Sequence, residues 1–205
     1  MYGFSPGASP MRLNRTFALF VGAGVAVTLA MSPASQAGKQ KWYERAVKKV
    51  EGSFTPAEAK PGQTVTFSVT VELNEGFHTY PTTQVDKMAA GMVNTIKFPT
   101  AGSVIFVGAV EDPKDPKSKA EPDAGILKLL YYPGSATFTR KAVVSPKATA
   151  GLTVMKLTGF KLSVCDKDNC FPPKDVPVEA KLKVLEGSVE VEKQYAKEVA
   201  EALAK

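Results

Sequence analysis

The sequence predicts an all-β fold: an immunoglobulin-like antiparallel β-sandwich with short flanking helices. Three observations predict it. The run from Thr64 to Leu73 alternates strictly between polar and apolar residues, several more β-rich runs follow it, and clusters of Gly, Pro, Asp and Ser separate these runs. About seven short strands in succession, with no helix between them, favour a sandwich over an α/β fold.

The first 37 residues have the pattern of a targeting segment. Two arginines precede an apolar run from Phe17 to Met31, and small residues ending at Ala37 suit a signal peptidase. We therefore expect a cleaved bacterial signal peptide over 1–37 and a periplasmic or secreted product. An uncleaved anchor is the alternative, since the apolar run falls just short of the roughly twenty residues that span a bilayer. Both Met1 and Met11 are compatible with the true start.

The charge of the expected mature chain argues against one class of partner. Without Arg12 and Arg15, Lys plus Arg falls from 26 to 24 against 20 Asp plus Glu, so the net charge falls from +6 to +4. The lysines are spread among acidic residues and form no basic stripe with interleaved aromatics, so we expect no nucleic-acid binding. We also expect no membrane span in the mature chain, because no later segment is long and apolar enough.

A lead-in segment is expected over 38–52, ahead of the sandwich domain. Trp42, Ala46 and Val50 recur at helical spacing with charges between them, which predicts a short surface helix or a loose lead-in. The sandwich is expected over 53–187. Its further strands are predicted at 94–98, 103–111, 126–132, 136–144, 153–164 and 176–186.

Two segments of this chain are predicted to lie outside the strands. The stretch from Glu111 to Gly125 carries three prolines and many charges without apolar periodicity, so we expect a long exposed loop. The tail over 188–205 places Val191, Tyr195, Val199 and Leu203 near one face, which predicts a closing amphipathic helix.

Cys165 and Cys170 are the strongest chemical feature of the sequence. Four turn-favouring residues, Asp-Lys-Asp-Asn, separate them, and a hairpin of this length would set the cysteines opposite each other at a spacing that a disulfide bridges. Two cysteines of an exported protein are expected to pair. A loop of six residues gains only about 2.2 kcal/mol from the crosslink. The bond is therefore a candidate for exchange, with a local structural disulfide as the alternative.

The residues around the pair leave their roles open. Lys167 and Lys174 would favour a thiolate, while Asp166 and Asp168 would oppose it. Two consecutive prolines after Phe171 confine the exit of the hairpin to a sheet edge or a loop. Phe171 itself suits either a shield for the disulfide or the core.

His78 is the only histidine of the chain, so multi-histidine metal sites are excluded. No nucleophile elbow accompanies it, and its place near a turn is typical of a packed structural histidine. A soft-metal site that joins it to both cysteines is chemically conceivable. The cysteine spacing is not that of a familiar zinc site, however, and we assign no metal ligands and no cofactor.

Two motifs together resemble a known family. The pattern C-x4-C followed by Phe171-Pro172-Pro173, and the earlier segment Gly76-Phe77-His78-Thr79-Tyr80-Pro81, are similar to motifs of the N-terminal periplasmic domain of DsbD, the bacterial thiol:disulfide interchange protein. The resemblance covers roughly Phe54 to Leu185. It implies an immunoglobulin-like fold whose cysteine pair cycles between disulfide and dithiol.

What the resemblance implies for the site concerns seven residues. Cys165 and Cys170 would be the reactive pair, and a second set would shield the disulfide or dock a partner: Phe171, Pro172, Pro173, His78 and Tyr80. Electrons would arrive from a thioredoxin-like or membrane thiol reductant and leave to periplasmic oxidoreductases. The spacing here has one residue fewer than in the best-known member. The membrane and thioredoxin-like domains of full-length members are not in this sequence, so we expect separate proteins to supply the electrons.

Three functional hypotheses follow, of which the third is metal carriage or another activity. In the first, the chain is an exported thiol:disulfide exchange module that passes electrons through Cys165 and Cys170, as a component of a protein-disulfide reductase if it is an enzyme at all. In the second, it is a non-catalytic extracytoplasmic interaction domain with a structural disulfide.

Overall fold

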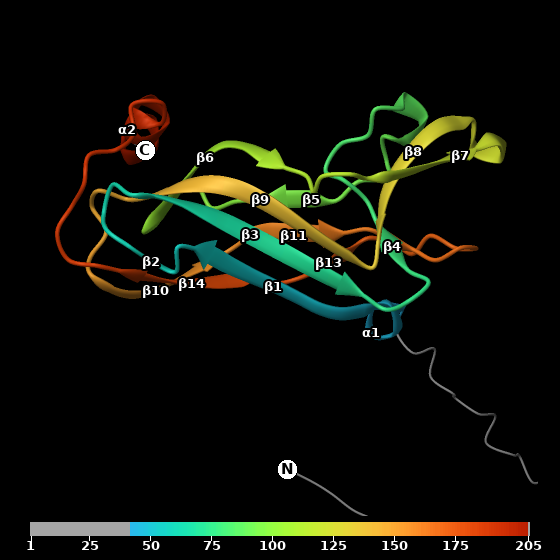
Figure 1. The fold of residues 1–205 in the computed structure, drawn as a ribbon, viewed down its shortest axis with the longest axis horizontal. Helices are drawn as coiled ribbons and strands as arrows, with labels where there is room; N and C mark the ends of the chain where they lie inside the picture. The colour runs from blue at the N-terminus through green and yellow to red at the C-terminus, as the bar shows by residue number, and fades with distance from the viewer. Residues whose placement is uncertain (1–41, 205) are drawn as a thin grey trace, which may run out of the picture. The chain divides into compact units, whose positions relative to one another are not determined.

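The computed structural model describes residues 42–204, and the expected signal peptide lies outside these residues. Most of the regular secondary structure of the described chain is β-strand, which confirms the predicted all-β, immunoglobulin-like sandwich (Figure 1). The helices are few and short: α1 (Trp42–Ala46) and α2 (Ala196–Leu203), with the 3₁₀ turns η1 (Lys87–Ala89) and η2 (Pro122–Ala124).

One layer of the sandwich is a four-stranded antiparallel sheet. Its order is β1 (Val47–Thr55), β3 (Thr64–Leu73), β9 (Ser135–Val144) and β6 (Val104–Glu111). The central strand β3 alternates between buried and half-buried side chains at every position, as its sequence predicts. Its apolar residues are fully buried because the second layer covers that face.

The second layer consists of two three-stranded sheets. One has the order β10 (Gly151–Lys156), β14 (Glu179–Val184) and β2 (Glu58–Ala59), and its β14–β2 pair is parallel. The other has the order β13 (Lys174–Asp175), β11 (Gly159–Leu162) and β5 (Thr95–Lys97). The main hydrophobic core lies between the layers and includes Phe54, Phe67, Phe138, Phe160 and Leu182.

A fourth sheet, of four strands, carries the cysteine strand. Its order is β12 (Val164–Cys165), β4 (His78–Thr79), β8 (Ile126–Pro133) and β7 (Lys117–Glu121). In Figure 1, β4 and β8 lie at one end of the sandwich and α2 lies at the other. The candidate site is therefore built at one end of the sandwich, away from the C-terminal helix.

Strand β7 corrects the expected loop from Glu111 to Gly125. Four residues of β7, Lys117 to Lys119 and Glu121, pair with β8, and η2 follows directly. Apolar periodicity is absent here because β7 is an edge strand whose side chains are exposed or half-buried. Alternation of apolar and polar residues indicates a strand only when one face of that strand is buried.

The flanking helices are shorter than the sequence predicts. Strand β1 begins at Val47, inside the expected lead-in of 38–52, so the helical spacing reaches only from Trp42 to Ala46. In the tail, the helix begins at Ala196, and Val191 and Tyr195 pack beside Val199 from the irregular segment before it. The apolar face predicted for one helix is therefore shared between helix α2 and the irregular segment before it.

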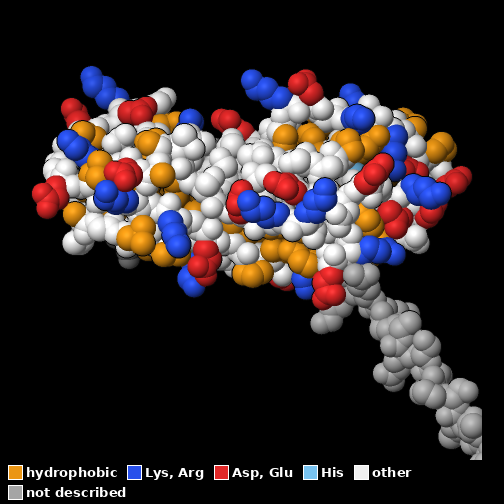
Figure 2. Space-filling view, turned by 60° about the horizontal axis from the view of Figure 1, so that its bottom comes forward, with side chains coloured by type: hydrophobic (Ala, Val, Ile, Leu, Met, Phe, Trp, Pro, Cys, Tyr) orange, Lys and Arg blue, Asp and Glu red, His pale blue; other side chains and the backbone are white. Residues whose placement is uncertain are grey.

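The surface agrees with the mixed charge of the sequence. On the face drawn in Figure 2, Lys and Arg side chains lie among Asp and Glu side chains, with small apolar areas between them. Within residues 42–204, no helix combines the length and apolar character needed to cross a bilayer.

Candidate functional site

A disulfide joins Cys165 at the end of β12 to Cys170, and the Cα atoms lie 4.1 Å apart. The turn between them is held by Asp166. Its Oδ1 accepts hydrogen bonds from the backbone N–H groups of Asp168 (2.9 Å) and Asn169 (2.7 Å), and its own N–H donates to the carbonyl of Asn169. An aspartate that bonds its own turn in this way explains why four residues suffice to close the hairpin.

The two sulfur-bearing residues differ in their access to solvent. Cys165 is 3% exposed and belongs to a small buried cluster with Tyr80, Ile126 and Leu129, whereas Cys170 is exposed. The bond thus has one sheltered end and one accessible end.

The Tyr80 hydroxyl lies at the sheltered end. It donates a hydrogen bond to Sγ of Cys165 at 2.8 Å and lies 3.6 Å from Sγ of Cys170. Nε2 of His78 is 3.3 Å from the same oxygen. The structure therefore brings together four of the residues selected from the sequence: both cysteines, His78 and Tyr80.

Strand pairing explains this convergence. Cys165 pairs with His78 across β12 and β4, and Val164 pairs with Thr79. The side chains of His78 and Tyr80 are two residues apart, which brings them to one face, while Thr79 points to the other. The alternation in His78-Thr79-Tyr80 therefore sends two polar rings toward the disulfide.

Burial changes the acid–base properties of both rings. It lowers the pKa of His78 to about 4, with a smaller contribution from the positive charge of Lys119, while Asp166 and Glu121 act in the opposite direction. Burial also raises the pKa of Tyr80 strongly. At neutral pH the imidazole and the phenol are therefore both uncharged.

Asn94 is a buried residue of the candidate site that the sequence does not reveal. It is 1% exposed, and its Nδ2 donates to the carbonyl of Tyr80 (2.6 Å) and to Oγ1 of Thr79 (2.9 Å). Its Oδ1 accepts from the backbone N–H of Ser163 at 2.8 Å. One amide thus ties the strand of Tyr80 to the strand of Cys165. A single asparagine at the start of an apolar run gives no sequence signal for such a role.

A cavity of about 180 Å³ opens beside the disulfide. Both cysteines and Tyr80 line it together with Lys119 and Glu121 of β7, which form an ion pair of 2.8 Å. The ammonium of Lys119 also lies 5.6 Å from the centre of the Tyr131 ring. These charged residues come from the segment expected as a loop, which is why they were not among the predicted site residues.

Phe171 packs on a different group of residues. Its ring stacks on Trp42 at 5.4 Å between centroids and lies 6.2 Å from Phe77, with the Arg45 guanidinium over both phenyl rings. It borders the main core, whereas Cys165 belongs to the smaller cluster. This places Phe171 as an anchor between the hairpin and α1.

The other expected flanking residues lie at the surface. Pro172 and Pro173 are exposed. The ammonium of Lys174 lies over the Tyr43 ring at 5.1 Å, and that of Lys167 lies 3.8 Å from the Asp168 carboxylate. Both lysines therefore have partners other than the cysteines.

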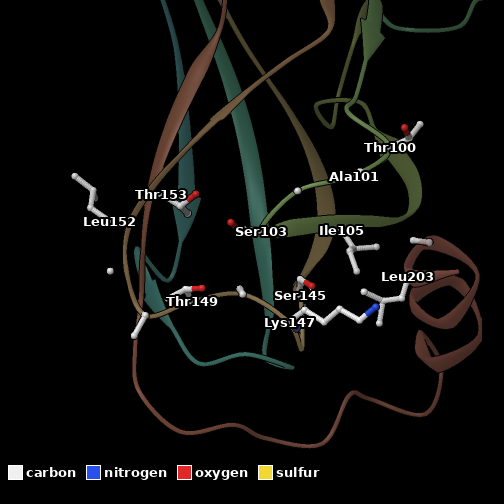
Figure 3. Close-up of a pocket in the computed structure, with 15 residues that line it drawn as sticks. Thr100, Ala101, Ser103, Ile105, Ser145, Lys147, Thr149, Leu152, Thr153 and Leu203 are labelled. Carbon is white, nitrogen blue, oxygen red and sulfur yellow. Dashed lines mark hydrogen bonds between the residues drawn. The ribbon is translucent and has the colours of Figure 1, made fainter. Parts of the chain in front are cut away.

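A larger hollow lies next to α2. It has a volume of about 630 Å³, and Figure 3 shows Ser145, Lys147 and Leu203 among the side chains that border it. Its labelled lining consists mainly of small, hydroxyl and aliphatic side chains, with Lys147 as the charged one. Across residues 42–204, no three His, Cys, Asp or Glu side chains lie together in a way that could hold a metal ion.

Comparisons with known proteins return structures only. No family model and no curated protein matches the chain. The N-terminal periplasmic domain of ScsB from Proteus mirabilis aligns with 18% identity and a TM-score of 0.42, over 73% of this chain and 51% of that chain. The alignment thus spans about half of that solved chain.

Two further structures align at lower scores. One is from a type I cohesin–dockerin complex of Clostridium thermocellum, with 14% identity and a TM-score of 0.36, over 67% of this chain and 99% of that chain. The other concerns aggregative adherence fimbriae of enteroaggregative Escherichia coli, with 14% identity and a TM-score of 0.26, over 66% and 99%.

Proposed function

We propose that this chain is an exported thiol:disulfide exchange module that passes an electron pair between partner proteins through Cys165 and Cys170. The observation that carries the proposal is the opposite exposure of the two bonded cysteines. Cys170 is open to a protein partner, while Cys165 is buried with a hydrogen-bond donor on its sulfur. Exchange needs one sulfur that can be attacked and one that can leave.

The exchange begins at the exposed sulfur. A partner thiolate attacks Sγ of Cys170 and forms a mixed disulfide, while the electron pair of the Cys165–Cys170 bond goes to Cys165. The Tyr80 hydroxyl, 2.8 Å from that sulfur, stabilises the leaving thiolate. A second thiol of the partner then attacks the partner sulfur that is bonded to Cys170, and Cys170 leaves as a thiolate. The partner is oxidised by two electrons and this chain is reduced by two.

The energetics of the crosslink support exchange over stapling. A six-residue loop gains only about 2.2 kcal/mol from closure. The hairpin is also held by the hydrogen bonds of Asp166 and by the packing of Phe171 on Trp42. The fold therefore has other means of keeping this turn in place.

The partners that fit are proteins with an accessible thiol. We take a thioredoxin-like protein or a membrane thiol reductant as the donor and periplasmic oxidoreductases as acceptors. This assignment comes from the resemblance of the two motifs. It requires export, with 1–37 as the signal peptide, 38–52 as the lead-in, 53–187 as the exchange domain and 188–205 as the C-terminal segment. In this role the chain is a component of a protein-disulfide reductase.

Trapping a mixed disulfide tests the proposal. The Cys165→Ser variant should form a stable mixed disulfide through Cys170 with a thioredoxin that keeps only its exposed active-site cysteine. The matched Cys170→Ser variant should trap little, because Cys165 is buried. If neither variant traps the thioredoxin, the non-catalytic interaction domain becomes the better account.

The reduction potential of the unmodified chain gives an independent check. Structural disulfides typically have potentials below about −300 mV, whereas exchanging pairs lie higher. Equilibration with glutathione or thioredoxin couples should place this pair above that value. A potential below it would mark the bond as structural.

A further inference from the structure

The Cys165 sulfur has a polar path toward the surface. The Tyr80 hydroxyl contacts Sγ of Cys165 at 2.8 Å and Nε2 of His78 at 3.3 Å, so a single oxygen connects the sulfur to the imidazole. His78 is 7% exposed, yet neither of its nitrogens is among the fully buried, unpartnered side-chain atoms of residues 42–204. Nδ1 is therefore not fully buried, whereas Nε2 faces Tyr80.

Thiol exchange requires proton movement at this buried sulfur. The Cys165 thiolate that forms when the disulfide opens is costly in an apolar cluster, and the Cys165 thiol must lose a proton before it can close the bond again. Bulk water reaches Cys165 poorly at 3% exposure. A protein group in contact with the sulfur can carry the proton instead.

We propose that Tyr80 and His78 form a proton relay between the Cys165 sulfur and solvent. The relay rests on the exchange function proposed above. During closure, the Cys165 thiol gives its proton to the Tyr80 oxygen while the phenolic proton passes to Nε2 of His78. The thiolate then attacks Cys170 of the mixed disulfide, and the departing thiolate takes the electron pair of the broken bond. His78 finally releases a proton to solvent, and opening runs the same steps in reverse.

The charges that face His78 suit this cycle. Lys119 of β7 lowers its pKa, Glu121 of β7 and Asp166 beyond β12 raise it, and the Tyr131 ring of β8 packs on it edge-on at 5.1 Å. With the disulfide closed, burial dominates and keeps the imidazole neutral, so it takes up a proton only when a negative charge forms beside it. A thiolate on Cys165 would add a nearby negative charge and favour the imidazolium.

Both members of the relay have defined roles. Tyr80 touches the reacting sulfur and is a catalytic residue in this proposal. His78 acts through Tyr80 and is a positioning residue that also holds the proton in transit. Glutamine at position 78 keeps an N–H donor for the Tyr80 oxygen but cannot titrate, so His78→Gln separates hydrogen bonding from proton transfer.

A dye release assay tests the relay on the purified chain. The reduced chain is mixed with one equivalent of 5,5′-dithiobis(2-nitrobenzoate). Cys170 attacks first and releases one thionitrobenzoate, and Cys165 then closes the disulfide and releases the second. The rate of the second release should change little with pH near neutrality in the unmodified chain. In His78→Gln and Tyr80→Phe it should fall about tenfold at pH 6.5 and rise about tenfold per pH unit, because only hydroxide then removes the proton.

The control and the contrary outcomes are distinct. Tyr131→Phe keeps the ring that packs on His78 and should retain the unmodified pH profile. A His78→Gln profile like that of the unmodified chain would overturn the relay, and so would a slower rate with unchanged pH dependence, which would mark a structural role. Because the dye replaces the protein partner, failure of the relay is read separately from failure to trap thioredoxin.

Discussion

Nδ2 of Asn94 donates a hydrogen bond of 2.6 Å to the backbone carbonyl of Tyr80. Through this bond and its contact with the Ser163 N–H, one buried side chain fixes the spacing between the strand of Tyr80 and the strand of Cys165. The distance between the Tyr80 hydroxyl and the Cys165 sulfur therefore depends on Asn94, whose side chain contacts neither of these two atoms.

Replacing Asn94 should destabilise the fold strongly. Asn94→Ala leaves the Tyr80 carbonyl, the Ser163 N–H and the Thr79 hydroxyl with fewer partners in a buried site, and we expect a loss of about 2–4 kcal/mol in the free energy of unfolding. Urea denaturation measures this loss. The exposed control Gln194→Ala should change stability by less than about 0.5 kcal/mol. A loss below 1 kcal/mol in Asn94→Ala would show that the network is not needed.

The two thiols of the reduced chain should react at different rates. Cys170 is exposed and Cys165 is 3% exposed, so iodoacetamide should modify Cys170 about tenfold faster or more. Peptide mapping by mass spectrometry over a time course gives both rates in one sample. Denaturing the chain in urea is the control, because it should bring the two rates close together. Equal rates in the folded chain would contradict the assignment of Cys170 as the attacked sulfur.

Removing the disulfide should cost little stability. The chain with Cys165→Ala and Cys170→Ala should lose about 2 kcal/mol in the free energy of unfolding, since the crosslink closes only six residues. Thermal and urea unfolding of the oxidised chain and this variant give the difference. A loss of 5 kcal/mol or more would instead assign the bond a structural role.

The alternation of β3 made the fold predictable, whereas much of the site depends on pairings that no local pattern encodes. The strand Thr64–Leu73 has one buried face, and its sequence therefore alternates between apolar and polar residues. Lys119 lies on an edge strand without a buried face, so its segment read as a loop. Cys165 and Cys170 were found because their spacing is local. The contact of Tyr80 with Cys165 joins residues 85 positions apart, and only the register of β4 and β12 creates it.

Acidification should lower the stability of the fold because the pKa of His78 is lowered by burial. Its pKa falls from 6.5 in the unfolded chain to about 4 in the folded chain, so between these values the unfolded state binds more protons. Stability should therefore decrease as pH falls from 6.5 to 4, by on the order of 3 kcal/mol from this residue. His78→Gln should show a flatter stability curve over the same range. Asp86, Asp166 and Glu192, whose pKa values are also lowered, are present in both proteins and contribute to both curves. Parallel curves would show that the pKa of His78 is the same in the folded and unfolded states.

The fluorescence of Trp42 should report the redox state of the hairpin. Trp42 is the only tryptophan of the chain, and its ring stacks on Phe171, the residue directly after Cys170. Opening the disulfide frees the hairpin to move, so reduction should change the stacking and with it the intensity or the maximum of the emission. Stacked aromatic pairs contribute about 0.5–1.5 kcal/mol, which is small enough for the loss of a crosslink to disturb.

Two variants decide whether this signal comes from the hairpin. Phe171→Leu removes the stacking partner and should abolish the emission change while leaving the disulfide intact. The double change of Cys165 and Cys170 to Ala should make the emission insensitive to dithiothreitol. An unchanged spectrum on reduction of the unmodified chain would mean that α1 and Phe171 hold the hairpin in place without the bond. The ends of the turn would then stay close together in the dithiol form, and exchange at Cys170 would proceed on a preformed hairpin.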